Sequence, residues 1–173
     1  MMEKGYIQVY TGDGKGKTTA AMGLALRAAG AGLKVFIGQF VKGMHYSELD
    51  ALKRYDDCIT VKQFGRGCFI HNKPSKEDIE AARKGLEEVA GIFTAGLYDV
   101  VILDEASIAL YYNLFTLDEL LHVLSGKKEH VEVVITGRRA PQKLVEAADL
   151  VTEMKEVKHY YQKGVQARTG IEK

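Results

Sequence analysis

The sequence of 173 residues lacks any apolar run that approaches the roughly 20 residues of a membrane-spanning helix. We therefore expect no membrane partner. The first residues, MMEKGYIQVY, lead almost directly into a predicted strand and carry no apolar segment of a secretory signal peptide. These two absences predict a cytoplasmic protein.

An excess of charge of one sign is also missing, since the formal net charge is +1. This balance gives no global field that would attract nucleic acid, so we expect none as a partner. Cysteine is scarce as well. Cys58 and Cys68 match no C-x-x-C spacing of a metal or redox site, and two cysteines are too few for a disulfide framework. A reduced, cytoplasmic setting is the expectation that follows.

Glycine and lysine, in contrast, are concentrated in one short stretch, TGDGKGKTT at residues 11–19. Residues 6–10 are rich in β-branched and aromatic side chains and predict a strand. A largely buried helix is predicted from Thr18 to a stop at Gly30 or Gly32. A glycine-rich loop between a strand and a helix is typical of phosphate binding, because its backbone N–H groups converge on an anion and the helix start adds its dipole.

This loop supplies most of the predicted nucleotide contacts. Lys17 is placed to reach the phosphates, and the Thr18 hydroxyl is placed to meet a divalent cation. The usual pattern has a glycine where this chain has Thr11. The alternative is a glycine-rich turn with solvated lysines, which the intact GKT between strand and helix disfavours. The predicted nucleotide-binding residues of the loop are Gly12, Asp13, Gly14, Lys15, Gly16, Lys17, Thr18 and Thr19.

Strand and helix patterns alternate along the rest of the chain. Helices are predicted to follow Ser75 and Thr116, each the start of a capping box, and to include Pro141 in a first turn. We expect one domain over residues 1–173, since no linker or internal repeat is visible. The predicted fold class is α/β, a phosphate-loop NTPase (RecA-like) three-layer fold with a mainly parallel sheet of about six strands. The further strands are predicted at 34–41, 60–64, 99–104, 131–136 and 150–155, the last of them half-exposed.

Charged residues follow three of the apolar strands. Asp104 and Glu105 end VVILDE at the carboxyl end of a strand, which is the edge of an open α/β sheet where ligands bind. A carboxylate there can hold Mg²⁺ opposite the phosphate loop, although strands also end in acids that merely face solvent. Arg138, after the next strand, either meets phosphate or belongs to a solvated loop. Lys42, after QFV, is a further candidate for contact with the ligand.

Five segments carry a more specific signal: YTGDGKGKTTAAMGLALRAAGAG, QFVKG, VVILDE, VVITGR and the tail VKHYYQKGVQARTGI. Together they resemble the phosphate-loop type of ATP:corrinoid adenosyltransferase. The opening of that family is similar to TG(N/D)GKGKTTAA, so Thr11 agrees with it. The tail matches the family pattern of VKH, an aromatic residue and GV-x-A-x-x-GI over residues 157–171. The resemblance spans nearly the whole chain.

The resemblance implies that a Co(I) corrinoid, cobalamin or cobinamide, attacks the ribose 5′-carbon of ATP and that the entire triphosphate leaves. It also implies that ATP lies reversed in the loop compared with ordinary phosphate-loop ATPases. On this basis Lys17, Lys15 and the amides of residues 12–18 bind the triphosphate. Thr18 and Glu105, with Asp104 close by, are the expected contacts of Mg²⁺ or Mn²⁺. Lys17, Lys15 and Glu105 are the expected catalytic residues.

Partners and the corrinoid face follow from the same resemblance, which implies a homodimer and an electron donor such as a flavoprotein. The corrinoid-facing loop of the family commonly carries phenylalanine and tryptophan. This chain has no tryptophan, and the corresponding stretch, GRGCFIHNK, leaves Phe69 as the aromatic candidate or as a partly buried loop residue.

Two other functions remain open from the sequence. One is a phosphate-loop ATPase or small-molecule kinase, for which the tail motif has no explanation. The other is a non-catalytic, nucleotide-dependent module that binds corrinoid.

Overall fold

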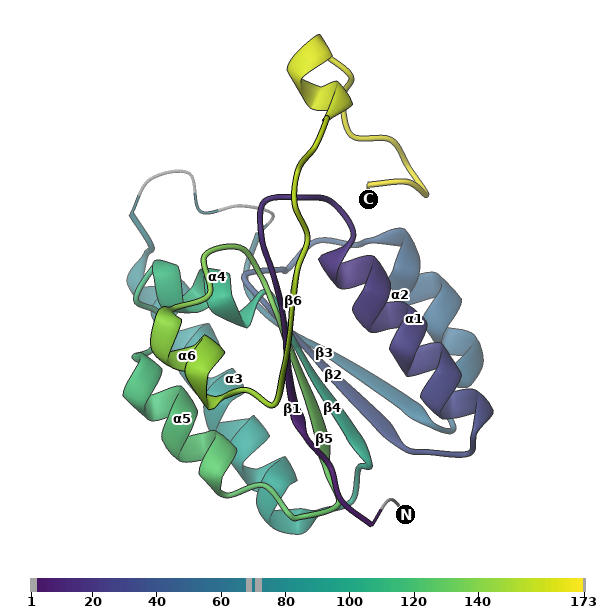
Figure 1. The fold of residues 1–173 in the computed structure, drawn as a ribbon, viewed down its shortest axis with the longest axis vertical. Helices are drawn as coiled ribbons and strands as arrows, with labels where there is room; N and C mark the ends of the chain where they lie inside the picture. The colour runs from purple at the N-terminus through teal and green to yellow at the C-terminus, as the bar shows by residue number, and fades with distance from the viewer. Residues whose placement is uncertain (1–2, 68–69, 71–72, 173) are drawn as a thin grey trace.

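The computed structural model describes residues 3–67, 70 and 73–172, which contain a six-stranded sheet. All of the pairings are parallel, and the strand order is β3-β2-β4-β5-β1-β6 (Figure 1). The strands are β1 (Ile7–Thr11), β2 (Val35–Phe40), β3 (Ile59–Phe64), β4 (Val100–Asp104), β5 (Glu132–Thr136) and β6 (Leu150–Glu153). The helices are α1 (Lys17–Gly30), α2 (Ser47–Leu52), α3 (Lys76–Ala95), α4 (Ala106–Tyr111), α5 (Leu117–Ser125) and α6 (Gln142–Ala147), and two 3-10 turns are η1 (Lys53–Tyr55) and η2 (Tyr160–Lys163).

Helices cover both faces of the sheet and give the three predicted layers (Figure 1). Helices α1 and α2 lie on one face, and α3, α4, α5 and α6 lie on the other. The predicted α/β class and parallel sheet are therefore confirmed, as is the stop of α1 at Gly30. Among the helices of the described ranges, none combines the length and the apolar character that a membrane crossing requires.

Strand β2 shows why the sheet needs helices on both faces. All of its residues, VFIGQF, are buried. Phe36 and Phe40 pack into the core beneath α3 and α5, whereas Val35 and Ile37 pack into the core beneath α1. Successive side chains of a strand point to opposite faces, so a nearly continuous apolar run is what a doubly covered strand requires.

Two helix starts carry the predicted capping boxes. The Ser75 hydroxyl accepts a hydrogen bond from the Asp78 N–H, and the Asp78 carboxylate accepts one from the Ser75 N–H, at the start of α3. Thr116 and Glu119 make the same exchange at the start of α5. Each box satisfies backbone donors that have no partner inside the helix.

The structure differs from the sequence prediction at its short elements. Helices α2 and α4 and the turn η2 were not predicted, because elements this short hold too few turns for a clear helical periodicity. Helix α6 is equally short and was predicted because Pro141 marks its start. Pro141 is the N-cap of α6 and does not lie within its first turn. The strand predicted at 150–155 is confirmed as the shorter β6, but the prediction that it is half-exposed was wrong: all of its residues are exposed, and it lies at the edge of the sheet.

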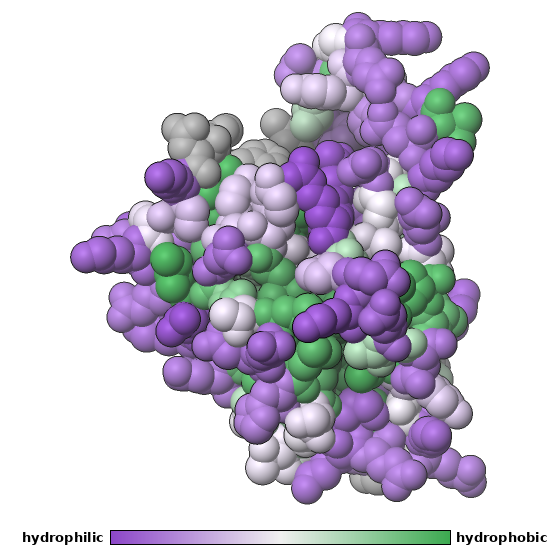
Figure 2. Space-filling view, turned by 60° about the vertical axis from the view of Figure 1, so that its left-hand side comes forward, coloured by the Kyte–Doolittle hydropathy of each residue, from purple (hydrophilic) through white to green (hydrophobic). Residues whose placement is uncertain are grey.

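Beyond β6 the chain leaves the sheet at its carboxyl edge, and we refer to residues 154–172 as the tail. In Figure 1 the tail rises to η2 and then returns toward the loop that follows β1. Figure 2 shows mostly hydrophilic side chains on the visible face of the tail. The tail is thus a surface segment that stands over the edge of the sheet where the predicted site lies.

Candidate functional site

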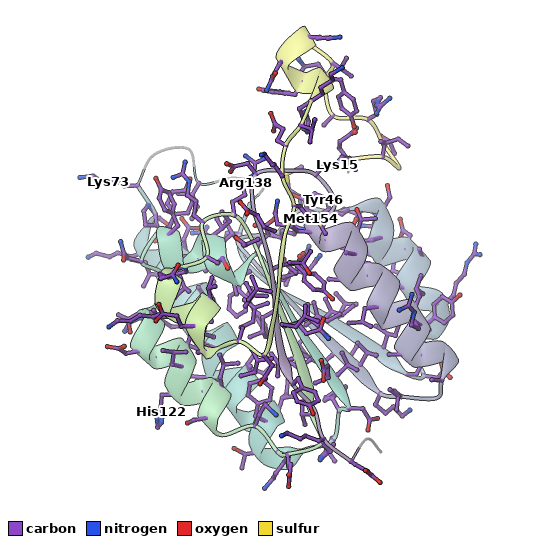
Figure 3. All side chains as sticks on the ribbon, in the orientation of Figure 1. Lys15, Tyr46, Lys73, His122, Arg138 and Met154 are labelled. Carbon is purple, nitrogen blue, oxygen red and sulfur yellow. The ribbon has the colours of Figure 1, made fainter. Side chains whose placement is uncertain are left out.

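The loops that follow β1, β2, β4 and β5 meet at the carboxyl edge of the sheet, since all of these strands are parallel. Hydrogen bonds join them: Thr18 at the start of α1, Lys42 after β2 and Thr136 at the end of β5 each contact Asp104 at the end of β4. Figure 3 shows Lys15, Tyr46, Arg138 and Met154 gathered at this edge, with His122 far from it.

The loop of residues 12–16 encloses the ammonium group of Lys17. Lys17 Nζ donates to the carbonyl oxygens of Gly12 and Gly14, each at 2.7 Å, and the residue is only 7% exposed. Burial lowers the pKa of Lys17, and the nearby Arg138 guanidinium lowers it further, while Glu105 and Asp13 act in the opposite direction. The loop thus holds a positive charge at its centre, where an anion would be bound.

The glycines of this loop are also required by a neighbour that the sequence did not predict. A Cβ atom on Gly12 or Gly14 would lie 2.5 or 2.6 Å from the carbonyl oxygen of Met154, in the first residue of the tail. The Gly14 N–H donates to that same oxygen at 2.7 Å. Gly12 and Gly16 have φ angles of 92° and 118°, which side chains disfavour. The bare backbone therefore serves close packing as well as the approach of a ligand.

Asp104 is the centre of a buried polar network. Its side chain is 0% exposed and receives four donors. Oδ1 accepts from the hydroxyls of Thr18 at 2.8 Å and Thr136 at 2.7 Å. Oδ2 accepts from Lys42 Nζ at 2.8 Å and Gln39 Nε2 at 3.3 Å. Each carboxylate oxygen of Asp104 therefore already accepts two hydrogen bonds within the protein. Asp104 can influence a metal only indirectly, by orienting the side chains that donate to it.

Lys42 forms an ion pair within this network and is only 12% exposed. Burial acts to lower the pKa of Lys42, but the charge and hydrogen bond of the Asp104 carboxylate raise the pKa above its ordinary value. Glu48 lies 3.7 Å from Lys42 Nζ, and the Tyr46 ring lies 5.0 Å from it. Lys42 is therefore a firmly protonated group beside Asp104.

Glu105 follows Asp104 and has an unusual backbone. Its φ of 58° is left-handed, a conformation that is uncommon for a residue with a side chain. Its N–H donates to Thr136 Oγ1 at 3.0 Å. Burial and the neighbouring Asp104 raise the pKa of the Glu105 carboxyl above its ordinary value, with Lys42, Lys17 and Arg138 acting in the opposite direction.

A cavity of about 470 Å³ opens beside Glu105. Its wall combines cationic, tyrosine and aliphatic side chains, and the Arg139 guanidinium stacks on the Tyr111 ring at 4.2 Å from its centroid. Such a wall suits a flat, partly apolar group that carries polar edges. The lining residues are Val41, Lys42, Tyr46, Ile70, Glu105, Ile108, Tyr111, Tyr112, Arg138 and Arg139. We call this the edge cavity.

Arg138 also lines a second cavity, of about 580 Å³, whose other walls come from the tail. The predicted Arg138 therefore lies between two cavities at the sheet edge. Lys15 is exposed, and its Nζ donates to the Ile171 carbonyl oxygen of the tail at 3.0 Å. Asp13 and Thr19 are exposed on the loop and on the first turn of α1. Phe69 lies outside the described residues.

The donor set suits Mg²⁺ or Mn²⁺ that is completed by phosphate oxygens. Within the described ranges, no group of three or more His, Cys, Asp or Glu residues forms a metal cage. The Thr18 hydroxyl donates a hydrogen bond to Asp104, which leaves an oxygen lone pair for a cation, and Glu105 offers a carboxylate in the edge cavity. One or two protein oxygens plus substrate phosphates are typical of Mg²⁺ sites in nucleotide enzymes.

Sequence reasoning missed Gln39, Thr136 and the tyrosines of the edge cavity. A signal for the first two was present, because each is a polar residue within an otherwise apolar strand. A buried polar group needs hydrogen-bond partners. Since Gln39 and Thr136 lie near the carboxyl ends of their strands, their partners are expected at the carboxyl edge of the sheet. The tyrosines lie on short elements, and their convergence depends on the fold.

Comparison with known proteins identifies the family of the chain. A sequence profile of the family described as ATP:corrinoid adenosyltransferase BtuR/CobO/CobP matches residues 3–172. Proteins named corrinoid adenosyltransferase from Pseudomonas aeruginosa and Escherichia coli K12 are 34% and 36% identical over 98% of this chain and 84% and 86% of their own length. One from Sinorhizobium is 36% identical over 98% of this chain and 81% of its own length. The chain therefore belongs to the ATP:corrinoid adenosyltransferase family.

Proposed function

We propose that the protein transfers the 5′-deoxyadenosyl group of ATP to the Co(I) of a corrinoid, cobalamin or cobinamide, and releases triphosphate. One observation carries the proposal: the Thr18–Asp104 hydrogen bond joins the phosphate loop to the carboxyl edge of the sheet, directly beside the edge cavity. Family membership supports the reaction, and the junction supports binding of the triphosphate in the loop with the adenosyl group and the corrin beside it.

In the proposed reaction a cobalt–carbon bond forms as the bond between the 5′-carbon and its oxygen breaks. The electron pair of the broken bond leaves with the triphosphate. Catalysis must therefore stabilise negative charge that gathers on the triphosphate and must hold the 5′-carbon in line with cobalt. The attacking cobalt carries no proton, so the reaction needs no general base.

The residues of the loop supply the positive field for the leaving group. Lys17 is the central charge, and the loop amides and Lys15 add donors once the triphosphate is bound. For Lys15 this requires exchange of the Ile171 carbonyl for a phosphate oxygen, which a charged acceptor favours. Arg138 and Lys42 add positive charge on the side of the edge cavity.

Thr18 and Glu105 would hold Mg²⁺ or Mn²⁺ against the triphosphate, with Asp104 fixing the Thr18 hydroxyl. A bound divalent cation would supply further charge stabilisation to the leaving group. The adenosyl end of ATP and the reacting face of the corrin are assigned to the edge cavity, whose tyrosines can stack against flat rings.

Three further features are proposed from family membership and composition. The protein acts as a homodimer, it receives electrons for Co(I) from a donor such as a flavoprotein, and it works in the cytoplasm. Sedimentation and assay with purified reduced flavoproteins test the first two directly.

Phosphorus NMR of the product mixture tests the function. The protein is incubated with ATP, Mg²⁺ and chemically reduced cobalamin, and a parallel sample lacks cobalamin. Intact triphosphate that appears only with cobalamin is the expected result. ADP or inorganic phosphate would instead indicate an ATPase or kinase, and unchanged ATP would indicate a non-catalytic corrinoid-binding module.

A further inference from the structure

We propose that Thr136 is a positioning residue that sets the geometry of both Asp104 and Glu105 for the nucleotide-bound metal. The inference rests on the proposed function for the identity of the nucleotide site. It concerns a residue at the end of β5 whose side chain is 0% exposed and which lies on none of the loops that carry charge.

The Thr136 hydroxyl makes two bonds in opposite senses. It donates its one proton to Asp104 Oδ1 at 2.7 Å, and it accepts the Glu105 N–H at 3.0 Å. Asp104 Oδ1 in turn accepts the Thr18 hydroxyl at 2.8 Å. A single oxygen on β5 therefore connects the end of β4, the first residue after it and, through Asp104, the phosphate loop.

The bond to Glu105 matters because of the backbone it holds. The left-handed φ of 58° is disfavoured for glutamate, so it persists where surrounding contacts impose it. The N–H bond to Thr136 is such a contact. It fixes the residue from which the carboxylate reaches the edge cavity, beside Lys42 and Arg138.

The bond to Asp104 acts on the other metal-facing group. The hydrogen bond to Asp104 fixes the Thr18 O–H, so the lone pairs of the Thr18 oxygen stay turned away from Asp104 and available to a cation. Thr136 donates to the same oxygen and so orients the carboxylate that accepts the Thr18 proton. Loss of the Thr136 hydroxyl would leave the Glu105 N–H unpaired and Asp104 Oδ1 with one donor fewer.

A packing role for Thr136 would make the opposite prediction. Valine has nearly the shape of threonine and would preserve packing at the end of β5. Three variants therefore distinguish a positioning role of the hydroxyl from a packing role: Thr136→Val removes the hydroxyl, Thr136→Ser keeps it, and Thr60→Val is the matched control. Thr60 lies near the amino end of β3, away from the carboxyl edge of the sheet, and its hydroxyl accepts from Tyr98 at 3.1 Å.

The experiment measures the affinity for ATP with Mn²⁺ and in EDTA, and follows Mn²⁺ binding by electron paramagnetic resonance. We expect Thr136→Val to weaken the Mn²⁺-dependent affinity about 10-fold, the scale of one charge-assisted hydrogen bond, while the affinity in EDTA changes less than 2-fold. Thr136→Ser and Thr60→Val should stay within about 2-fold of wild type in both conditions.

Equal loss of affinity with and without Mn²⁺, or wild-type Mn²⁺ binding by a folded Thr136→Val, would overturn the proposal. If Thr136→Val does not fold, Thr136→Cys replaces the hydroxyl by a weaker hydrogen-bonding group. It is judged in the same way, by comparing its loss of ATP affinity with Mn²⁺ and its loss in EDTA. The readout does not depend on adenosyl transfer. Formation of ADP by the wild-type protein would therefore refute the proposed function and leave the inference on Thr136 standing.

Discussion

The phosphate loop is held from two sides by contacts of different kinds. From within, the side chains of the Asp104 network bind it through Thr18, and all of the Asp104 acceptors are used. From outside, the exposed tail binds it through the backbone carbonyls of Met154 and Ile171. A substitution can remove a side-chain donor but not a backbone carbonyl. Side-chain changes in the Asp104 network should therefore have large effects, and most changes in the tail should have small ones.

The largest effect is expected for Lys17→Ala. Loss of the charge at the centre of the loop should lower kcat/KM for adenosyl transfer on the order of 10²-fold or more. The matched control is Lys163→Ala, an exposed lysine of the tail, which should stay near wild type. The fold should survive in both, as circular dichroism would show. Near-normal transfer by folded Lys17→Ala would remove Lys17 from the site.

Lys42→Met should have the next largest effect and should appear in stability. It leaves the buried Asp104 Oδ2 with Gln39 alone, and an under-compensated buried charge costs about 2–4 kcal/mol. A fall in Tm of several degrees is expected. Lys62→Met removes an exposed pair with Glu88 and is the control, with little or no change. Equal Tm values for the two variants would show that the buried ion pair contributes no more to stability than the exposed one.

Glu105→Gln should move stability in the other direction. Burial and Asp104 raise the Glu105 pKa, so the folded protein binds more protons than the unfolded one. Wild-type stability therefore falls as pH rises from about 4.5, the ordinary pKa of glutamate, through the raised pKa. The variant lacks this slope, so it should be the more stable protein at pH 7 but should require more Mg²⁺ for activity.

Thermal unfolding from pH 4 to 8 and Mg²⁺ titrations of activity test this pair of effects. Glu87→Gln, an exposed residue of α3, is the control for both. An unchanged Mg²⁺ requirement would take Glu105 out of the metal site. A lower Tm at pH 7 would show that its carboxylate is stabilising.

The smallest effect is expected for Glu172→Gln in the tail. The Arg168 and Tyr160 side chains hold the pKa of Glu172 at about 2, so its contribution is present above about 4.5 and is lost only as pH falls through about 2. The side chain of Glu172 is 17% exposed, and its hydrogen-bond partners Tyr160 and Arg168 both belong to the tail, so Tm between pH 5 and 8 should not change measurably. Faster hydrogen exchange of the Arg168 amide, which donates to Glu172 Oε2 at 2.9 Å, is the expected local sign. A clear fall in Tm would show that the tail contributes to the stability of the folded α/β domain.

The interior of this fold could be predicted from the sequence. Buried strands leave continuous apolar runs, and helix starts leave capping residues at fixed spacing, so both signals are local. Six strands were placed within two residues of their observed ends, and the acids Asp104 and Glu105 at the end of β4 were placed at the carboxyl edge of the sheet. The loop that follows β1 was also identified, because its glycines and lysines are contiguous in the chain.

The remaining features depend on contacts between distant residues. The left-handed Glu105 rests on Thr136, and the close approach at Gly12 rests on Met154, so neither has a signal in its own neighbourhood. The motif at residues 157–171 was visible as a pattern, but the tail contacts Gly14 and Lys15 through the backbone carbonyls of Met154 and Ile171, which leave no trace in residue type. Phe69 lies outside the described residues, so the assignment of Phe69 to the corrinoid face stays a prediction.

The contact between Gly14 and Met154 also constrains the order in which the molecule assembles. Strand β1 lies between β5 and β6, with Ile7 in register with Val133 and Gln8 with Leu150. During synthesis the first strand must therefore wait for partners that are made far later, and contacts between such distant residues are slow to close. The phosphate loop, one of the earliest segments of this sequence to be made, is expected to take its final shape only after residues beyond Met154 have left the ribosome.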